Sequence, residues 1–461
     1  MKAVRGGVCS LIGAALWLSA AALAHAQDEV IPLIVELLGD KDKEVRSLAL
    51  EQVRTEVKGE AATLKFAELL PTLPPETQVG LLSALAGRGD AAAAPAVRKL
   101  VAESEQSEVR IAAIDALAFL GTEADVATLV KLLASDSDAQ QKAARASLVR
   151  LAGDAASQAI VAEMQRAPAP LRVSLIEILT QRRTGVPELL TAALDNDSQI
   201  RSAAMEALGQ LASPDDMPTL LQGVFKAQRG AERNAAERAV AAVCQRTPDK
   251  AAQAAPLVTA MKSLNAIKQR ALLSTLGRVG GPAALERLEA AYGDDDPETH
   301  AAAMAAMCNW PDGSIAPRLL ELARIEEHPE HRTQARKTLI RIAPLPDDRS
   351  DARRLDLLRT TMKMCADDAE RKQVLERAKA IRTIETLRFV VPYLDDPDFA
   401  PQACVTVVEL AHHSRLREPH KAEFHKALDQ VIAISKDPVV IDRAQRYKTG
   451  QTWVRPKAPA S

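Results

Sequence analysis

The sequence predicts an all-α protein, an α-α superhelix in which about 12–13 two-helix repeats stack into a solenoid. Of its 461 residues 47% are hydrophobic but only 3% are aromatic, which disfavours β-sheet because sheets favour aromatic and β-branched residues. A single hydrophobic core stops growing at roughly 250–300 residues, so a chain of this length is not one globule. A local pattern also recurs about every 32 residues along nearly the whole chain.

Residues 1–26 have the pattern of a secretory signal peptide. Lys2 and Arg5 form a positive start, residues 8–23 are apolar, and the small residues of Ala-His-Ala precede a cleavage site. The apolar stretch is shorter than the roughly 20 residues that a spanning helix needs, and an uncleaved N-terminal anchor is the alternative. We therefore expect cleavage after Ala26, a periplasmic or secreted protein, and no membrane span after cleavage.

The repeats are aligned on one residue near the start of each second helix, usually a base that follows valine or isoleucine. These anchors are Arg46, Gly80, Arg110, Lys142, Arg172, Arg201, Arg233, Lys268, His300, Arg332, Arg371 and Gln402. Their spacing places repeats 1–10 in residues 27–344 and repeats 11–13 in residues 345–447, with the thirteenth expected to be partial.

Two segments depart from this period. The longest interval between anchors contains residues 343–350, whose prolines and aspartates predict a bend or loop. Residues 448–461 have no periodic apolar pattern, and we expect them to form a flexible C-terminal tail.

Each repeat is predicted to be a pair of antiparallel helices. The first helix carries an aliphatic face, as in residues 31–38. The second has small or apolar residues at positions −1, +3, +6 and +7 from the anchor, for example Val109, Ala113, Ala116 and Leu117. These positions share one side of a 3.6-residue helix. One pair cannot bury that stripe alone, so the pairs must stack.

Paired aspartates mark the start of the second helix. They occur at −6 and −4 in five repeats: Asp40/Asp42, Asp136/Asp138, Asp195/Asp197, Asp294/Asp296 and Asp396/Asp398. We expect the −4 carboxylate to be the N-cap of the second helix, where it accepts hydrogen bonds from unpaired backbone N–H groups. The anchor base is expected to reach the acidic loop of its own or the next repeat, in a ladder of ion pairs worth about 1 kcal/mol or less each.

A helix pair of about 32 residues with Asp-x-Asp-x-x-Val-Arg-x-x-Ala at the start of its second helix resembles the HEAT repeat, in its short phycobilisome-lyase-like form. The resemblance covers about residues 29–447, departs at Gly80 and Gln402, and is to the exported bacterial type of these armadillo/HEAT-like solenoids. It implies a scaffold that binds proteins, and no particular activity.

The sequence contains no catalytic motif. Gly-x-Ser-x-Gly, nucleotide-binding glycine loops and His-Glu-x-x-His are all missing from it. The 59 basic and 61 acidic residues nearly balance, which argues against a nucleic-acid binder. We predict a protein that is not an enzyme, with no catalytic residues, no cofactor and no nucleic-acid partner.

Cysteines and histidines are the remaining candidates for chemistry. Four cysteines follow the signal peptide: Cys244, Cys308, Cys365 and Cys404. We expect them to pack as small buried residues, and Cys365 and Cys404 are the only plausible disulfide pair. His328 and His331 are expected in an inter-helix loop, and His300 as an ordinary anchor. Four later histidines flank one turn and could converge on a metal: His412, His413, His420 and His425. The preferred interpretation is that they are solvated residues at helix ends, and we predict no metal site.

One surface feature recurs in the second helices. Acidic residues stand at position +5, which points away from the predicted core, and we take them as candidate partner-binding residues: Glu51, Asp115, Glu177, Glu206 and Glu376. The hypothesis is a weakly acidic groove over the first six repeats; a merely solvated helix face is the alternative. The stripe is interrupted at the same position by Leu85, Leu273, Ala305 and Val407.

These observations predict an exported, non-enzymatic scaffold that binds a protein partner in the cell envelope through its concave face. The alternative is a subunit of an enzyme or lyase-like complex that handles a ligand together with a partner chain.

Overall fold

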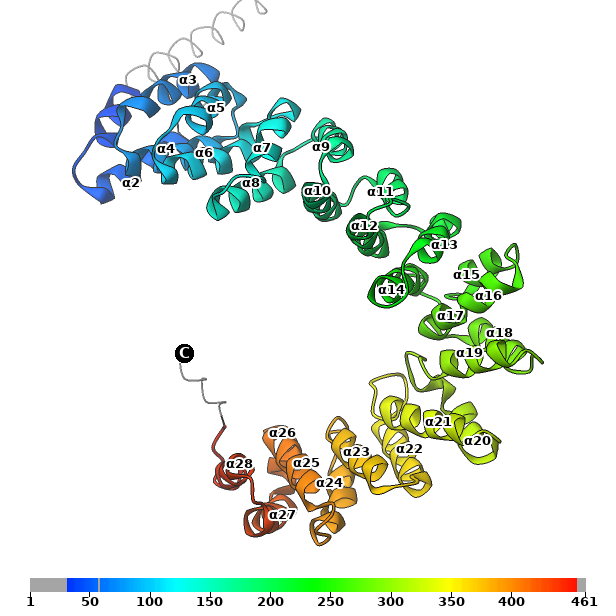
Figure 1. The fold of residues 1–461 in the computed structure, drawn as a ribbon. Helices are drawn as coiled ribbons and strands as arrows, with labels where there is room; N and C mark the ends of the chain where they lie inside the picture. The colour runs from blue at the N-terminus through cyan, green and yellow to red at the C-terminus, as the bar shows by residue number, and fades with distance from the viewer. Residues whose placement is uncertain (1–30, 57–58, 454–461) are drawn as a thin grey trace, which may run out of the picture. The chain divides into compact units, whose positions relative to one another are not determined.

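The computed structural model describes residues 31–56 and 59–453, and every regular element within these residues is helical (Figure 1). The all-α prediction is confirmed. The described residues divide between two compact units. Unit 1 comprises Met1–Ala212 and Gln222–Ala236, and unit 2 comprises Ser213–Leu221 and Glu237–Ser461.

The elements of the two units are as follows. Unit 1 contains a helix at residues 31–38, then α2 (Lys43–Thr55), α3 (Glu60–Leu69), α4 (Pro75–Arg88), α5 (Ala94–Glu103), α6 (Ser107–Leu120), α7 (Val126–Leu132), α8 (Asp138–Arg150), α9 (Asp154–Arg166), α10 (Ala169–Arg182), α11 (Val186–Ala192) and α12 (Ser198–Leu211). Both units share α13 (Met217–Lys226) and α14 (Ala231–Gln245). Unit 2 continues with α15 (Ala255–Met261), α16 (Ala266–Ala271), α17 (Leu273–Val279), α18 (Pro282–Tyr292), α19 (Pro297–Met307), α20 (Ala316–Ile325), α21 (Pro329–Ile342), α22 (Asp351–Met364), α23 (Asp368–Ala378), α24 (Ile384–Val390), α25 (Ala400–His412), α26 (Ser414–Arg417), α27 (Lys421–Ile434) and α28 (Pro438–Lys448). Short 3-10 turns are η1 (Leu70–Thr72), η2 (Ala91–Ala93), η3 (Glu123–Asp125), η4 (Pro214–Asp216), η5 (Gly313–Ile315), η6 (Val391–Leu394) and η7 (Glu418–His420).

The helices of each unit form two rows. In unit 1 the second helices α2, α4, α6, α8, α10 and α12 pack on one another in chain order, and the first helices α3, α5, α7, α9 and α11 form the other row (Figure 1). In unit 2 the second helices α21, α23, α25 and α28 pack in the same order. Because α27 and α28 pack together as a full pair, the thirteenth repeat is complete, whereas the sequence predicted a partial one.

The predicted core positions are buried. In α6, Val109, Ala113, Ala116 and Leu117 each expose at most 1% of their surface. Small residues let neighbouring helices approach closely, most tightly at Gly277 of α17, where an added Cβ would lie 2.1 Å from the backbone oxygen of Ala306 in α19. The stack therefore buries the stripe that one helix pair would leave in water.

The predicted N-caps are right in three of the five repeats. The side chains of Asp42, Asp197 and Asp296 accept backbone N–H groups at the starts of α2, α12 and α19. The prediction is wrong for α8, which Ser137 caps. It is also wrong for α25, which begins after Phe399 with no side-chain cap.

The aspartate at −6 has a role of its own. The Asp40 Oδ1 atom accepts the backbone N–H of Asp42 at 2.7 Å, and Asp195 accepts that of Asp197 at 2.8 Å. This local hydrogen bond is an Asx turn, which orients the loop so that the next aspartate can cap the helix. The pair thus acts in sequence: one carboxylate shapes the turn and the other caps the helix.

The anchor side chains bind backbone carbonyl groups. Arg46 donates to the oxygens of Asp40 and Lys41 at 3.0 and 2.9 Å, and Arg201 donates to those of Asp195 and Asn196 at 2.9 and 2.8 Å. These carbonyls end the preceding first helix or belong to the turn after it, where helical partners are lacking. The anchor therefore fastens the two helices of a repeat together.

Glutamine fills this role in three repeats, and the predicted anchors there are wrong. Nε2 of Gln78 donates to the Leu73 carbonyl at 2.9 Å, that of Gln141 to Ser135 at 2.6 Å, and that of Gln269 to Leu264 at 2.8 Å. These residues replace Gly80, Lys142 and Lys268 as anchors. With this correction the steps between anchors in unit 1 fall within 29–32 residues.

The expected ion pairs between repeats are present in unit 1. Arg46 lies 3.2 Å from Glu76 and Arg172 lies 2.8 Å from Asp195, each acid belonging to the next repeat. Arg201 pairs with Glu232 at 2.8 Å, and the two side chains are only 5% and 11% exposed. The last pair is buried enough to matter for stability.

Residues 343–350 form the expected loop, inside unit 2. Asp347 pairs with Arg349 at 2.7 Å and accepts the backbone N–H of Gly313 at 3.1 Å. Asp348 pairs with Lys250 at 2.6 Å. The loop is thus held by contacts to residues 34 and 98 positions earlier in the chain.

The predicted signal peptide, residues 1–26, lies outside the described residues. At the other end, the part of the predicted tail that the structure describes lies against α28, since the Arg443 guanidinium is 5.0 Å from the centre of the Trp453 ring. Among the described residues, none of the helices has both the length and the apolar character needed to cross a membrane.

Candidate functional site

Four of the five predicted binding residues lie in one row of unit 1. Glu51 is in α2, Asp115 in α6, Glu177 in α10 and Glu206 in α12, and all four are exposed. Each stands at the outward position of a second helix, and the residues on both sides of Asp115, Glu177 and Glu206 are buried in the core. These helices form the inner of the two rows of unit 1 in Figure 1. We call these four side chains the acidic row.

The corrected anchors make this row more regular than the sequence indicated. Measured from Gln78 and Gln141, the equivalent positions in α4 and α8 are Ser83 and Ala146. Leu85, which broke the predicted stripe, is a fully buried core residue. From α2 to α12 this position therefore carries an acid or a small residue in every second helix.

Two members of the acidic row have basic neighbours. Glu51 lies 3.2 Å from Arg54, and Glu177 lies 2.7 Å from Arg145. Both carboxylates are more than half exposed, at 56% and 52%. Exposed pairs of this kind are worth about 0.2–1 kcal/mol, so another cation can replace the internal base at little cost.

Asp115 is in a different electrostatic setting. Burial among neighbouring atoms raises the pKa of its carboxyl, and the Arg150 guanidinium offsets part of that rise. Water therefore solvates this charge incompletely although the side chain is exposed. A cation bound here would stabilise the carboxylate more than it would a fully hydrated one.

Large apolar side chains accompany the acids. Leu48, in α2, is 58% exposed and stands three residues before Glu51, and Phe119, in α6, is 59% exposed and stands four residues after Asp115. Residues three and four apart share a helix face. The row thus combines carboxylates with exposed apolar groups, which is the composition of a protein-binding surface.

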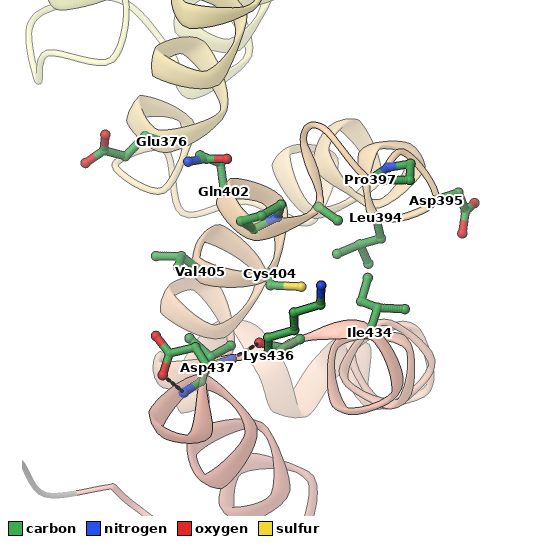
Figure 2. Close-up of a pocket in the computed structure, with 14 residues that line it drawn as sticks. Glu376, Leu394, Asp395, Pro397, Gln402, Cys404, Val405, Ile434, Lys436 and Asp437 are labelled. Carbon is green, nitrogen blue, oxygen red and sulfur yellow. Dashed lines mark hydrogen bonds between the residues drawn. The ribbon is translucent and has the colours of Figure 1, made fainter.

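Glu376 does not belong to the acidic row, because it lies in α23 of unit 2 and pairs with Lys379 at 3.4 Å. It stands at the edge of a hollow of about 980 Å³, into which Leu394, Cys404 and Ile434 project (Figure 2). The Glu376 carboxylate points away from this hollow. The outward position of the neighbouring second helix α21 carries a base, Lys337.

The cysteines are placed as predicted. Cys244, Cys365 and Cys404 are buried, Cys308 is partly buried, and all four are free thiols. Burial raises the pKa of Cys244 to about 12 and those of Cys365 and Cys404 to about 11. Such thiols are protonated at neutral pH and are therefore poor nucleophiles.

The late histidines do not gather around one point. His412 donates to or accepts from the Tyr447 hydroxyl at 2.9 Å through Nδ1, and its ring centre is 5.5 Å from that of His413. In the described part of the chain, three or more metal-ligating side chains converge elsewhere, at His300, Glu326, His328 and His331. The convergence of these four side chains was not predicted from the sequence. The sequence did contain a signal for this site: histidine is unusual both at an anchor, where His300 stands, and at a −1 core position, where His331 stands.

Comparison with known proteins gives a family match for part of the chain. Residues 63–149 match the family model for HEAT repeats. No protein of curated function matches the sequence.

Among solved structures, the chain is similar to a Kap121p mutant (12% identity, TM-score 0.43, covering 93% of this chain and 54% of that one). It is also similar to Kap95p in a structure of its binding to RanGDP (12%, TM-score 0.45, 91% and 66%) and to importin beta (14%, TM-score 0.34, 96% and 71%). This chain spans between half and two thirds of the length of the two Kap proteins. With TM-scores below 0.5, these likenesses do not bear on what it binds.

Proposed function

We propose that this chain is an exported, non-enzymatic scaffold that binds a basic segment of a partner protein along the acidic row of unit 1. The HEAT-repeat match of residues 63–149 and the stacked helix pairs support this proposal. The observation that carries the proposal is the placement of four exposed carboxylates at one equivalent position of α2, α6, α10 and α12. A repeat array offers such a surface because each repeat presents the same position to the same side.

The spacing of the helices limits the partner. Packed helices lie 8–10 Å apart, so α2 to α6 and α6 to α10 each span roughly 20 Å, and α10 to α12 roughly 10 Å. An extended chain rises about 3.3 Å per residue. The partner segment is therefore about 15 residues long, with bases separated by about six, six and three residues.

The chemistry of the row supports a segment that is both basic and apolar. Arg54 and Arg145 hold their acids only weakly, so the partner's bases replace them without a large penalty. Apolar side chains of the partner would cover Leu48 and Phe119, whose exposed surface is unfavourable in water. Binding energy would concentrate at Phe119, because buried aromatic anchors dominate interfaces of this type.

We also propose that the protein acts outside the cytoplasm, in the periplasm or as a secreted protein, where it meets its partner in the cell envelope. The positive start, the apolar stretch and the Ala-His-Ala sequence of residues 1–26 support this. Cell fractionation with mass measurement of the mature chain tests it: a mature N-terminus at Gln27 in the envelope or medium supports the proposal, and a cytoplasmic chain that begins at Met1 refutes it.

Charge reversal tests the binding surface. The variant Glu51→Lys, Asp115→Lys, Glu177→Lys and Glu206→Lys is compared with the wild type in affinity capture from the envelope fraction. A matched control reverses four acids outside the second helices of unit 1, three in first helices and one in the turn η3 before α7: Glu68→Lys, Glu103→Lys, Glu163→Lys and Glu123→Lys. Both variants change the net charge equally, and circular dichroism checks that each remains folded.

We expect the wild type and the control to capture the same partner and the acidic-row variant to lose it. Raising the salt concentration should weaken the wild-type complex, because the contacts are between exposed charges. Equal capture by all three proteins would show that the partner binds elsewhere. Loss from both variants would show a dependence on net charge alone and would also refute the proposed surface.

A further inference from the structure

Three histidines and a glutamate come together in unit 2. Each of His300, Glu326, His328 and His331 offers one ligand atom, and these atoms all lie within 4.8 Å of one another. The rings form a triangle, with centres 5.8 Å apart for His300 and His328, 5.5 Å for His300 and His331, and 5.0 Å for His328 and His331.

Repeat geometry explains why these residues meet. His300 is the anchor of α19, and His331 stands one residue before Arg332, the anchor of α21 in the next repeat. The same two positions meet in unit 1, where the anchor Arg201 contacts Glu232, one residue before the anchor Arg233. Glu326 and His328 lie in the short turn between α20 and α21, beside this contact.

The histidine at the anchor is oriented for a ligand. Its Nδ1 lies 2.6 Å from the backbone oxygen of Tyr292, which can only accept, so Nδ1 carries the proton. The lone pair is therefore on Nε2, and that atom is buried with no hydrogen-bond partner. A backbone carbonyl that fixes the far nitrogen of a histidine is the usual arrangement around protein-bound metals.

The same holds for His331, and the glutamate beside it is buried. Nδ1 of His331 is also buried with no hydrogen-bond partner. The Glu326 side chain is only 5% exposed, and its ion-pair partners are His328 at 2.7 Å and His331 at 3.7 Å. A buried carboxylate beside buried ring nitrogens without partners is unfavourable unless a cation binds there.

We propose that His300, Glu326, His328 and His331 bind one divalent transition-metal ion, of which Zn²⁺ is the best match. Three imidazoles and one carboxylate are ligands that Zn²⁺ accepts in a tetrahedral site, with bonds of about 2.0–2.2 Å. Ligand atoms in such a site are roughly 3.3 Å apart. The His328 side chain is 56% exposed and its Nδ1 already lies 2.7 Å from the Glu326 carboxylate, so a rotation of this surface ring would complete the closure.

Four protein ligands make this a closed, structural site rather than a catalytic one, which keeps a position open for water. The metal would tie the second helix of one repeat to the turn and second helix of the next. It would therefore hold α19 and α21 in register at the place where Arg201 and Glu232 form an ion pair in unit 1.

Zinc binding by the full-length mature chain, prepared without a histidine tag, tests the site. The chain is stripped with a chelator, dialysed against Zn²⁺, and its bound metal measured by mass spectrometry. Two variants restore residues that other repeats use. His300→Arg reproduces Arg172, which donates to the carbonyl of Met164 eight residues earlier, as His300 does to Tyr292. His331→Val reproduces Val109 at the −1 position.

We expect one zinc per wild-type chain, one in the control His420→Ala, and at least tenfold weaker binding in both repeat-restoring variants. Cobalt in place of zinc should give the visible absorption of a tetrahedral ion. A wild type that binds well below one zinc per chain, or variants that bind as the wild type does, would overturn the site. If a repeat-restoring variant does not fold, His328→Ala decides, since that side chain is exposed and its loss spares the core.

Discussion

Replacing the anchor Arg201 tests whether anchors hold the repeats together. Arg201→Ala removes a guanidinium that binds two backbone carbonyls and the carboxylate of Glu232. Arg201→Gln is the informative variant, because Gln78, Gln141 and Gln269 occupy this position naturally and bind the equivalent carbonyls. The two variants should therefore differ in severity.

The structure sets the size of the two effects. In Arg201→Ala, Glu232 is left without its base at 11% exposure and two carbonyls lose their donor. Breaking a buried pair in this way costs about 3–5 kcal/mol. Arg201→Gln breaks the same ion pair, and in both variants Glu232 still accepts the backbone N–H of Gln228 at 3.0 Å. The glutamine retains one hydrogen bond to a carbonyl, so we expect this variant to lose about 1 kcal/mol less than Arg201→Ala.

Hydrogen–deuterium exchange of α12 and α14, together with urea unfolding, measures these effects, since repeat arrays need not unfold in one step. The control Arg145→Gln breaks an exposed pair, with side chains 34% and 52% exposed, and should cost about 1 kcal/mol or less. The reasoning is refuted if Arg201→Gln is as severe as Arg201→Ala, or if Arg201→Ala is as mild as the control.

Three further predictions concern packing, pH and thiol reactivity. Gly277→Ala would place a Cβ 2.1 Å from the backbone oxygen of Ala306, so the urea midpoint should fall by an amount equivalent to about 2–3 kcal/mol; an unchanged midpoint would contradict the tight approach of α17 and α19. Burial raises the pKa of Glu409, but the hydrogen bond from Arg443 at 2.7 Å and its charge outweigh burial, so the net pKa is lowered. The stability that this lowered pKa contributes is present above the ordinary pKa of glutamate and is lost as pH falls through the lower folded value. Glu409→Gln should therefore reduce the loss of unfolding free energy at acid pH. Identical acid slopes of stability for the variant and the wild type would contradict this prediction. The pKa values of about 12, 11 and 11 for the buried thiols predict negligible alkylation of Cys244, Cys365 and Cys404 in the native protein at pH 8 and rapid alkylation in urea; fast native labelling would show that these cysteines are accessible.

The fold was predictable because its signals are local and repeated. The −1, +3, +6 and +7 positions follow from the helical period, and residues such as Ala113 and Leu117 are buried as expected. The register failed in three repeats because the alignment placed each anchor on the residue after valine or isoleucine, or on a base, and none of the three glutamines fits that pattern. Glutamine makes the same carbonyl contact without charge, so Gln78 was passed over and the buried Leu85 was placed on the surface.

The binding residues were predictable only in part. The outward position of Glu51, Asp115, Glu177 and Glu206 follows from the helical period, but the separation of Glu376 into another unit depends on packing that no local pattern encodes. The four metal-ligand candidates were missed for a related reason. Their convergence requires the contact between the anchor of one repeat and the −1 position of the next, which is a property of the stack and not of either repeat.

The position of the partner on unit 1 is the claim that most needs a direct measurement. A photoreactive phenylalanine analogue is introduced at Phe119, beside Asp115 on the second-helix row, or at Leu64, which is exposed on α3 of the first-helix row. Illumination in the intact envelope fraction then links the partner covalently to whichever site it touches. We predict a cross-link to the basic segment from position 119 and none from position 64. A cross-link from position 64 alone would place the partner on the first-helix row and contradict the proposed function.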